Sequence, residues 1–240
     1  MRSWISALLA TAAIIAAPVS ADASSLQITP VNIEVPAPGA ASKVTLANNG
    51  SEQLSAQIRV FKWVQKNGKD VLEETRDVVA SPPAMKIGAG KKSVIRVVRV
   101  NKKPAASEES YRLIVDEIPA PPKPGKAGVG FAIRYSVPVF FSKPGEDVEL
   151  SWKASVANGQ LTLKAENAGG RRVRLAALKV VGNNGKSVSF GSGLSGYVLG
   201  QSLKTWTAKA KSIAPGGIIK IVAQGDNGPI EATAKVQAAN

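Results

Sequence analysis

Apolar and polar residues alternate with a period of two along most of this chain, a pattern typical of β-strands that bury one face. Glycine, proline and asparagine separate the alternating segments, as expected for turns. In the first part of the chain the pattern predicts strands at Leu26–Val35, Ser42–Leu46, Leu54–Trp63, Val71–Val79, Lys92–Val100, Tyr111–Ile118 and Gly128–Phe141. About seven short strands at this spacing indicate an immunoglobulin-like β-sandwich.

A second series of alternating segments follows Ser142–Gly145, which we interpret as the hinge between two domains. Its predicted strands are Val148–Val156, Gln160–Asn167, Val173–Val181, Gly196–Val198, Lys204–Ala208, Ile218–Gln224 and Ile230–Val236. No amphipathic helix of useful length and no heptad pattern interrupts them. The sequence therefore predicts an all-β protein of two domains, an immunoglobulin-like β-sandwich at residues 24–142 and a second small β-sandwich at residues 146–240.

Residues 1–23 have the pattern of a secretory signal peptide. Arg2 supplies the positive start, Ile5–Pro18 is the apolar run, and cleavage is expected after Ala21 or Ala23. The alternative is an uncleaved anchor, but the apolar run is shorter than the roughly 20 residues that span a bilayer. We therefore expect an exported protein that is not inserted in the membrane. The absence of cysteine favours the bacterial periplasm over the location of a small disulfide-stapled extracellular protein.

The composition excludes several kinds of chemistry. The chain has no cysteine and no histidine, so the usual zinc sites and the Ser-His or Cys-His nucleophilic pairs cannot form. Its carboxylates often come in adjacent pairs such as Glu73 and Glu74, and neighbours on a strand point to opposite faces. No enzyme activity, metal or cofactor is therefore expected.

The chain is strongly basic, with a net charge of +14 from 31 Lys and Arg against 17 Asp and Glu. Few aromatic residues accompany the basic ones, and the protein is expected to leave the cytoplasm, so nucleic acid is not an expected partner. Two interpretations stay open: a solvated basic surface, or steering toward acidic protein partners.

The segment Gly128–Phe141 is the main candidate for a binding element. Val129, Phe131 and Ile133 alternate along it and therefore share one face of the predicted strand. That face could pack into the domain's own core, or it could be added to the sheet of another protein. The residues alone do not decide between these two roles.

Several stretches, taken in order, resemble the PapD-like family of periplasmic pilus-assembly chaperones. In the first domain these are Leu46–Gly50 (LANNG), Arg59–Gly68 (RVFKWVQKNG), Ser81–Pro83, Gly90–Arg96, Tyr111–Pro119 (YRLIVDEIP) and Val137–Phe141 (VPVFF). In the second domain they are Leu161–Asn167, the glycines Gly169 and Gly170, Val173–Leu175 and Gly196–Leu199, followed by Trp206. The resemblance spans nearly all of the mature chain.

This resemblance implies a boomerang of two immunoglobulin-like domains and a non-enzymatic function. A family member stabilises a pilus subunit by donor-strand complementation, in which its long seventh strand fills the groove of the incomplete subunit. It then delivers the subunit to an outer-membrane usher. The resemblance assigns Val129, Phe131 and Ile133 to this donor strand. Self-capping dimers and the identity of the pilus stay open, and the alternative function is a secreted structural or adhesive protein built of two immunoglobulin-like modules.

The chain departs from the family at the usual anchor for the carboxylate of the subunit. Family members commonly carry Arg on the first strand and Lys on the seventh, and the matching positions here are Asn32 and Pro138. Their lack of charge resembles the archaic-type branch of the family. Arg134 together with Arg96 is the expected replacement, and Arg112 is the next candidate. Each could instead be a solvated arginine or pair with Asp116, Glu117 or Glu34.

Two further expectations concern the joint between the domains. Four aromatic residues in the strand patterns should lie in a core or at the domain interface: Trp63, Trp152, Trp206 and Tyr197. Glu117 is a candidate for an ionic pair that fixes the hinge, with a partner that the sequence does not name.

Overall fold

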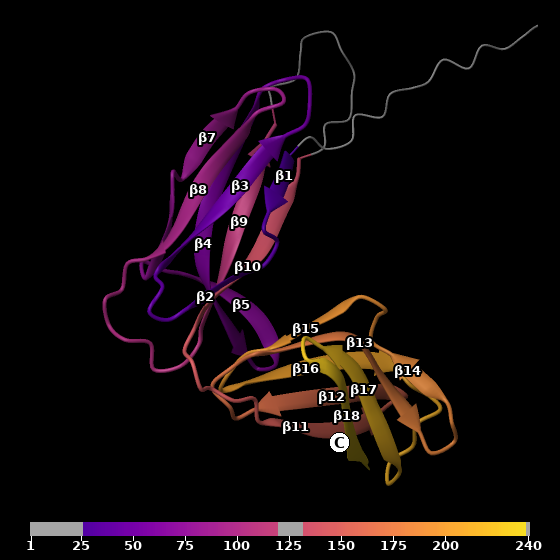
Figure 1. Cartoon of the computed structure of the whole chain (residues 1–240). Helices are drawn as coiled ribbons and strands as arrows, with labels where there is room; N and C mark the ends of the chain where they lie inside the picture. The colour runs from indigo at the N-terminus through magenta and orange to yellow at the C-terminus, as the bar shows by residue number, and fades with distance from the viewer. Residues whose placement is uncertain (1–25, 120–131, 239–240) are drawn as a thin grey trace, which may run out of the picture.

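The computed structural model describes residues 26–119 and 132–238, which form two β-sandwiches joined by the segment after Ser142 (Figure 1). The predicted signal peptide and two donor-strand candidates, Val129 and Phe131, lie outside the described residues. In the described part of the chain, no helix is long and apolar enough to cross a membrane.

The first sandwich consists of a four-stranded and a six-stranded sheet. The order in the smaller sheet is β1 (Leu26–Thr29), β3 (Ala41–Asn48), β8 (Lys92–Arg99), β6 (Val78–Ser81). The order in the larger is β2 (Ile33–Pro36), β10 (Arg134–Ser142), β9 (Glu109–Ile118), β4 (Leu54–Lys66), β5 (Lys69–Glu74), with β7 (Ala84–Ile87) beside β4. Alternate residues of both sheets meet in one apolar core, which includes Leu46, Ile95, Leu113 and Val139.

The second sandwich comprises β11 (Leu150–Ala157), β12 (Gln160–Asn167), β13 (Val173–Gly182), β14 (Ser187–Ser189), β15 (Leu194–Val198), β16 (Ser202–Lys209), β17 (Ile218–Gly225) and β18 (Gly228–Ala238). The order is β14-β13-β17-β18-β11-β12-β16, and β15 pairs with β13. Its two halves are connected through the parallel pair of β11 and β18. A separate core fills it, with Leu161, Leu163, Leu178 and Ile221 among its buried residues.

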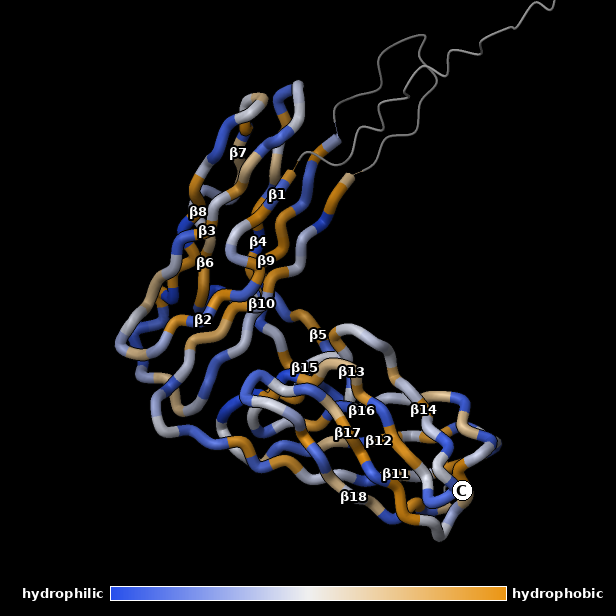
Figure 2. Tube along the Cα trace, turned by 45° about the vertical axis from the view of Figure 1, so that its right-hand side comes forward, coloured by the Kyte–Doolittle hydropathy of each residue, from blue (hydrophilic) through white to orange (hydrophobic). Residues whose placement is uncertain are grey.

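The strands agree with the alternation of the sequence, with a few informative differences. Figure 2 shows apolar and polar residues alternating along the strands of both sandwiches. The predicted strand Leu26–Val35 is divided into β1 and β2, which belong to different sheets. Ile28 and Ile33 are both buried although they lie five positions apart. In one continuous strand, residues an odd number of positions apart would face opposite sides, so the strand must be interrupted between them. The predicted strand Val71–Val79 is likewise divided into β5 and β6, and β7 and β14 were not predicted.

The long hairpin of β4 and β5 extends from the first sandwich to the second (Figure 1). At its tip the carbonyl of Gly68 accepts a 3.0 Å hydrogen bond from the backbone N–H of Thr205 on β16. Gly68 has a φ of +77°, and a Cβ at this position would lie 2.2 Å from the Oγ1 of Thr205. Glycine is therefore required here both for the backbone conformation and for the close approach of the two domains.

Candidate functional site

One half of β10 forms an open sheet edge. Strand β9 pairs with β10 from Arg134 to Phe141, whereas β2 covers only Val139–Ser142 on the other side. In residues 26–119 and 132–238, no strand covers Arg134–Pro138 on that side. The main-chain groups along this edge can therefore pair with a strand from another chain.

Ile133, the described member of the predicted donor set, directly precedes this edge. Its carbonyl accepts a 2.8 Å hydrogen bond from the backbone N–H of Glu117, so the pairing with β9 continues to Ile133. Its own N–H lies 3.4 Å from Oε2 of Glu117. The side chain of Ile133 is half-buried.

Arg112 lies on the outer face of the larger sheet, directly opposite Pro138 on β10. Its guanidinium carbon is 3.8 Å from the centroid of the Trp63 ring and 6.0 Å from that of Tyr197, in the second domain. Nη1 donates a long hydrogen bond, 3.4 Å, to the carbonyl of Ser136. Within the described residues no carboxylate forms an ion pair with Arg112.

The electrostatic setting of Arg112 reflects this lack of a direct partner. Burial lowers the pKa of Arg112 because it weakens the hydration of the charged form, and the negative charge of Asp70 opposes this effect only in part. A guanidinium that is stacked on an indole and has no carboxylate partner can donate hydrogen bonds to a carboxylate of another chain.

Arg134 lies on the same face as Pro138, as its parity predicted, but it already has a counter-charge. It forms an ion pair with Asp116, which also binds Arg59 at 2.6 Å. Burial raises the pKa of Asp116, but the hydrogen bonds from Arg134 and Arg59 outweigh this and the pKa is lowered. The pair with Asp116 is one of the alternatives considered for Arg134 from the sequence.

The structure does not bring Arg96 and Arg134 together. Arg96 is exposed on β8 in the smaller sheet, between Ile95 and Val97, whose side chains face the core. Arg96 and Arg134 thus lie on the outer faces of opposite sheets, where they cannot bind the same carboxylate. Parity along a strand could not reveal this, because it does not say which strands share a sheet.

Asn32 and Pro138, the positions without the expected charge, lie next to each other. Ile33 is in register with Val139 in the parallel pair of β2 and β10, which places Asn32 beside Pro138. Arg112 lies directly across from Pro138 on the other side of β10. The cationic group closest in register to the expected anchor is therefore on β9.

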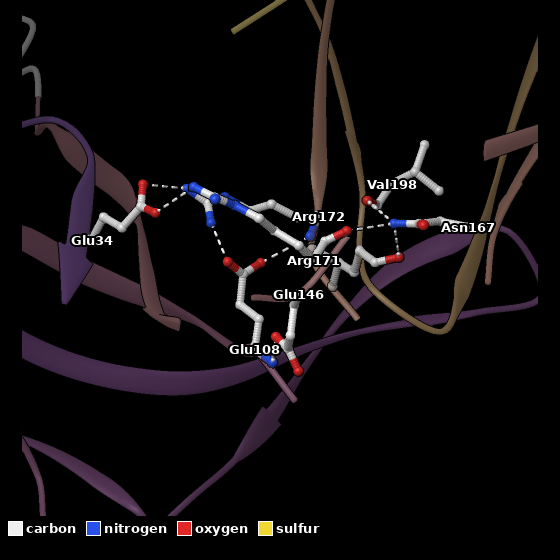
Figure 3. Close-up of polar contacts among 8 residues, drawn as sticks. Glu34, Glu108, Glu146, Asn167, Arg171, Arg172 and Val198 are labelled. Atoms are coloured by element: carbon white, nitrogen blue, oxygen red, sulfur yellow. Dashed lines mark hydrogen bonds and ion pairs between the residues drawn. The ribbon is translucent and has the colours of Figure 1, made fainter. Parts of the chain in front are cut away.

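A second arginine, Arg172, fixes the joint between the domains (Figure 3). Its side chain is only 5% exposed, and it forms ion pairs with Glu34 on β2, at 2.8 Å, and with Glu108 just before β9. Its guanidinium carbon lies 3.5 Å from the centroid of the Phe140 ring. Arg171 binds the other oxygen of Glu34 at 2.9 Å. These contacts connect residues more than 60 positions apart in the chain.

Backbone contacts hold this cluster in place. Glu108 accepts a 3.0 Å hydrogen bond from the N–H of Arg172, and its own N–H donates to Glu146 at 2.8 Å. The amide of Asn167 donates to the carbonyl of Arg171 at 2.7 Å and accepts from the N–H of Gly169, which shapes the turn before Arg172. Burial raises the pKa of Glu108, although Arg172 acts in the opposite direction.

These contacts correct the expectation for the hinge. In the described part of the chain, Glu117 contacts the N–H of Ile133 and no group of the second domain. The ionic pairs between the domains join Glu34 to Arg171 and Arg172, Glu108 to Arg172, and Asp70 to Lys204. Sequence reasoning missed Glu108 and Arg172. The only available signal was the charge-rich run Arg171–Arg174 directly after two glycines.

The expected aromatic residues divide between the interface and a core. Trp63, Phe140, Tyr197 and Leu199 form a buried cluster between the domains, with Trp63 and Tyr197 edge to face at 5.4 Å. Trp152 and Trp206 stack at 6.1 Å against the core of the second domain. The prediction of core or interface positions for the four aromatic residues is therefore confirmed.

Polar contacts from the β4–β5 hairpin extend the interface. The amide of Gln65 donates to the carbonyl of Tyr197 at 2.7 Å and accepts from the N–H of Leu199 at 3.1 Å. Asp70 forms an ion pair with Lys204 on β16 and accepts a 3.1 Å hydrogen bond from Nε1 of Trp63. Both residues are on the hairpin and bind groups of the second domain.

These features define a two-domain β-sandwich protein in which, among residues 26–119 and 132–238, the first domain has an open sheet edge and an arginine at the domain junction has no ion-pair partner. A family model described as pili and flagellar-assembly chaperone, PapD N-terminal domain, matches residues 25–145. The chain belongs to this family of PapD-like pilus-assembly chaperones. It is a chaperone and not an enzyme.

Solved structures of similar proteins cover most of the chain. A structure of the CsuC–CsuE chaperone–tip adhesion subunit complex, from the archaic Csu pili of Acinetobacter baumannii, is similar with 29% identity and a TM-score of 0.68. The match covers 90% of this chain and 100% of that one. The SafA pilin–SafB chaperone complex of Salmonella enterica has 18% identity, a TM-score of 0.62 and coverage of 89% and 98%, which shows the shared fold. No curated protein sequence matches this chain.

Proposed function

We propose that this protein is a periplasmic chaperone that binds pilus subunits by donor-strand complementation and delivers them to an outer-membrane usher. Its family membership supports the chaperone role. The similar structures include CsuC with the tip adhesion subunit CsuE and SafB with the pilin SafA. By analogy, the client of this chain is a subunit of a pilus.

The single observation that carries the proposal is the open edge of β10 from Arg134 to Pro138. Main-chain hydrogen bonds along this edge would complete the sheet of a subunit that lacks a strand, and would prevent that sheet from aggregating. Ile133 directly precedes the open edge, and Val129 and Phe131 share its parity in the sequence. Burial of each side chain stabilises the complex by about 1.5–3 kcal/mol before the cost of ordering.

We further propose Arg112 as the principal anchor for the carboxylate of the subunit. It combines three properties: it lies across from Pro138, it has no ion-pair partner in the described chain, and it rests on Trp63. Arg134 is less suited because Asp116 already balances its charge, and Arg96 lies on the other sheet. The planar guanidinium can bind both oxygens of a carboxylate.

Export and delivery complete the proposed function. The signal peptide predicted in residues 1–23 would direct the chain to the periplasm. Delivery at the usher would require only the replacement of the donated strand by another strand, because each main-chain hydrogen bond that breaks can form again in the new pair.

The test is co-expression of the full chain with the secreted proteins encoded beside it, in a bacterial periplasm. We define the client as the protein that stays soluble and co-purifies only when this chain is present. Replacing Phe131 and Ile133 by serine should abolish co-purification of the client, because the donated face loses most of its apolar area. Circular dichroism checks that the variant is folded.

The matched control replaces Val79 and Val94 by serine. These two valines are 40% and 52% exposed on the smaller sheet, and this variant should retain the client. If the variant of Phe131 and Ile133 binds the client as well as the control does, the assignment of the donor strand is wrong. If no secreted protein depends on the chain for solubility, a structural or adhesive role replaces the chaperone proposal.

A further inference from the structure

Asp70 lies at the centre of a chain of contacts that leads from the second domain to Arg112. It is on the hairpin strand β5, and its carboxylate binds three side chains. Oδ2 forms an ion pair with Lys204 of β16, and Oδ1 accepts hydrogen bonds from Nε1 of Trp63 at 3.1 Å and from Nε2 of Gln65 at 2.9 Å. Asp70 is thus a single carboxylate that contacts both the second domain and the residue on which Arg112 is stacked.

Trp63 lies between Asp70 and Arg112 and contacts both. Its side chain is buried, and the face of its ring carries the guanidinium of Arg112 at 3.8 Å. A hydrogen bond at Nε1 fixes the rotation of an indole about its side-chain bonds, and therefore the plane on which the guanidinium lies. The negative charge of Asp70 also acts directly on Arg112, because it favours the charged guanidinium.

The second domain also contributes Tyr197, which lies next to both Trp63 and Arg112. Tyr197 packs edge to face against Trp63 at 5.4 Å, and its ring centroid is 6.0 Å from the guanidinium carbon of Arg112. Gln65, which binds Asp70, also binds the backbone of Tyr197 and Leu199. Groups from both domains thus surround Arg112 and the ring on which it is stacked.

We propose that Asp70 is a positioning residue that couples the docking of the two domains to the orientation of Arg112, so that the guanidinium is aligned for a client carboxylate only when Lys204 holds Asp70. The proposal rests on the proposed function, because it takes Arg112 as the anchor. Asp70 and Lys204 do not contact the client in this mechanism. By thermodynamic linkage, a bound client strengthens the docking of the domains by the same factor by which docking strengthens binding.

The experiment uses the full chain and two readouts. The first is nuclear magnetic resonance of the free protein, which follows the indole N–H of Trp63 and the guanidinium N–H of Arg112. The second is the affinity for the co-expressed client defined above. The first readout needs no client, so it separates a failure of this proposal from a failure of the proposed function.

Three variants of lysines on β16 test the coupling. Lys204→Met removes the ion pair with Asp70 and should shift the signals of both Trp63 and Arg112 and weaken client binding by about tenfold, within the usual range of coupling between sites. Lys204→Arg retains a cation and should restore both signals and binding. The matched control is Lys209→Met, an exposed position on the same strand, which should change neither readout.

The possible results are distinguishable. Unchanged Arg112 signals in both Lys204→Met and Asp70→Asn would overturn the coupling, whatever the client does. If the signals shift but binding is retained while Arg112→Met abolishes binding, the alignment of Arg112 by Asp70 has no role in binding and the proposal is overturned. If Arg112→Met itself leaves binding intact, Arg112 is not the anchor, and the proposed function must use another residue.

Discussion

Two arginines at the junction of the domains rest on aromatic rings, yet they differ in their counter-charges. Arg172 lies 3.5 Å above Phe140 and forms ion pairs with both Glu34 and Glu108. Arg112 lies 3.8 Å above Trp63 and has no ion-pair partner within the described residues. One arginine is thus paired with two carboxylates inside the protein, and the other pairs with none in the described part of the chain.

This difference indicates distinct roles for two similar side chains. A buried cation with two carboxylates stabilises one geometry, because the loss of either partner leaves a charge in a poorly hydrated site. A half-buried cation without a carboxylate gains most from an external anion. The paired arginine is therefore suited to fix the angle between the domains, and the unpaired one to bind a client.

The largest expected effect is the loss of the paired arginine. Arg172→Leu would leave Glu108, whose side chain is 1% exposed, without a cation, and should lower the free energy of unfolding by about 3–5 kcal/mol. The matched control is Arg171→Leu, because Arg171 is 50% exposed and, among the described residues, forms an ion pair only with Glu34, so its loss should cost about 1 kcal/mol or less. Urea unfolding measures both. Equal effects of the two substitutions would show that the buried pair does not stabilise the joint.

Substitution of Arg112, the unpaired arginine, should affect client binding more than the free energy of unfolding. Arg112→Met should weaken client binding by about 1.5–3 kcal/mol, the range for a hydrogen bond to a charged group. It should change the free energy of unfolding by only about 1 kcal/mol, because only the contact with the ring is lost. Binding is measured by titration of the purified client complex. A larger loss of binding in Arg134→Met than in Arg112→Met would move the anchor to Arg134.

A smaller effect on the free energy of unfolding is expected at the tip of the β4–β5 hairpin. This hairpin carries Trp63, on which Arg112 is stacked, and its tip contacts the second domain. Gly68→Ala introduces both an unfavourable φ and a contact with Thr205. The control is Gly90→Ala, which has a φ of +66° but no atom within 4 Å of the new Cβ, and should cost about 1–2 kcal/mol. Gly68→Ala should cost more in urea unfolding. Equal costs would show that the hairpin tip can move away from β16 freely.

The smallest expected effects are in the dependence of stability on pH, and they have opposite signs for the carboxylates beside the two arginines. Burial raises the pKa of Glu108 above 4.5, so the folded protein binds this proton more tightly than the unfolded chain does. The contribution of Glu108 to the free energy of unfolding therefore falls as the pH rises from 4.5 through the raised pKa.

The pKa of Asp70 is shifted in the opposite direction from that of Glu108. Burial raises its pKa, but the hydrogen bonds from Lys204, Gln65 and Trp63 outweigh this and bring the pKa below 3.8. Its contribution is complete above pH 3.8 and is lost as the pH falls through the lowered pKa. Urea unfolding of the wild type, Glu108→Gln and Asp70→Asn across the acidic range measures both. For each variant, the difference in the free energy of unfolding from the wild type is plotted against pH. If this difference changes in the same direction with pH for both variants, the opposite shifts of the two pKa values are contradicted.

The sequence determined the fold class of this protein, and its local alternation explains why. Period-two alternation and regular turns predicted an all-β chain of two β-sandwich domains, and Gln160–Asn167 agrees in both limits with β12. Alternation also predicted that Arg134 and Pro138 share one face of a strand. These are short-range properties, since a strand presents every second residue to the same side.

Only the tertiary structure decided which charges meet. From the sequence, Arg134 together with Arg96 was the first candidate for the carboxylate anchor. However, Arg134 on β10 and Arg96 on β8 belong to opposite sheets, and Asp116 already pairs with Arg134. The partners of Arg172 are 64 and 138 positions away in the chain, and Arg112 is distinguished by the absence of such a partner in the described residues. Coulomb interactions depend on distance in space and on burial, and neither can be read from alternation along one strand.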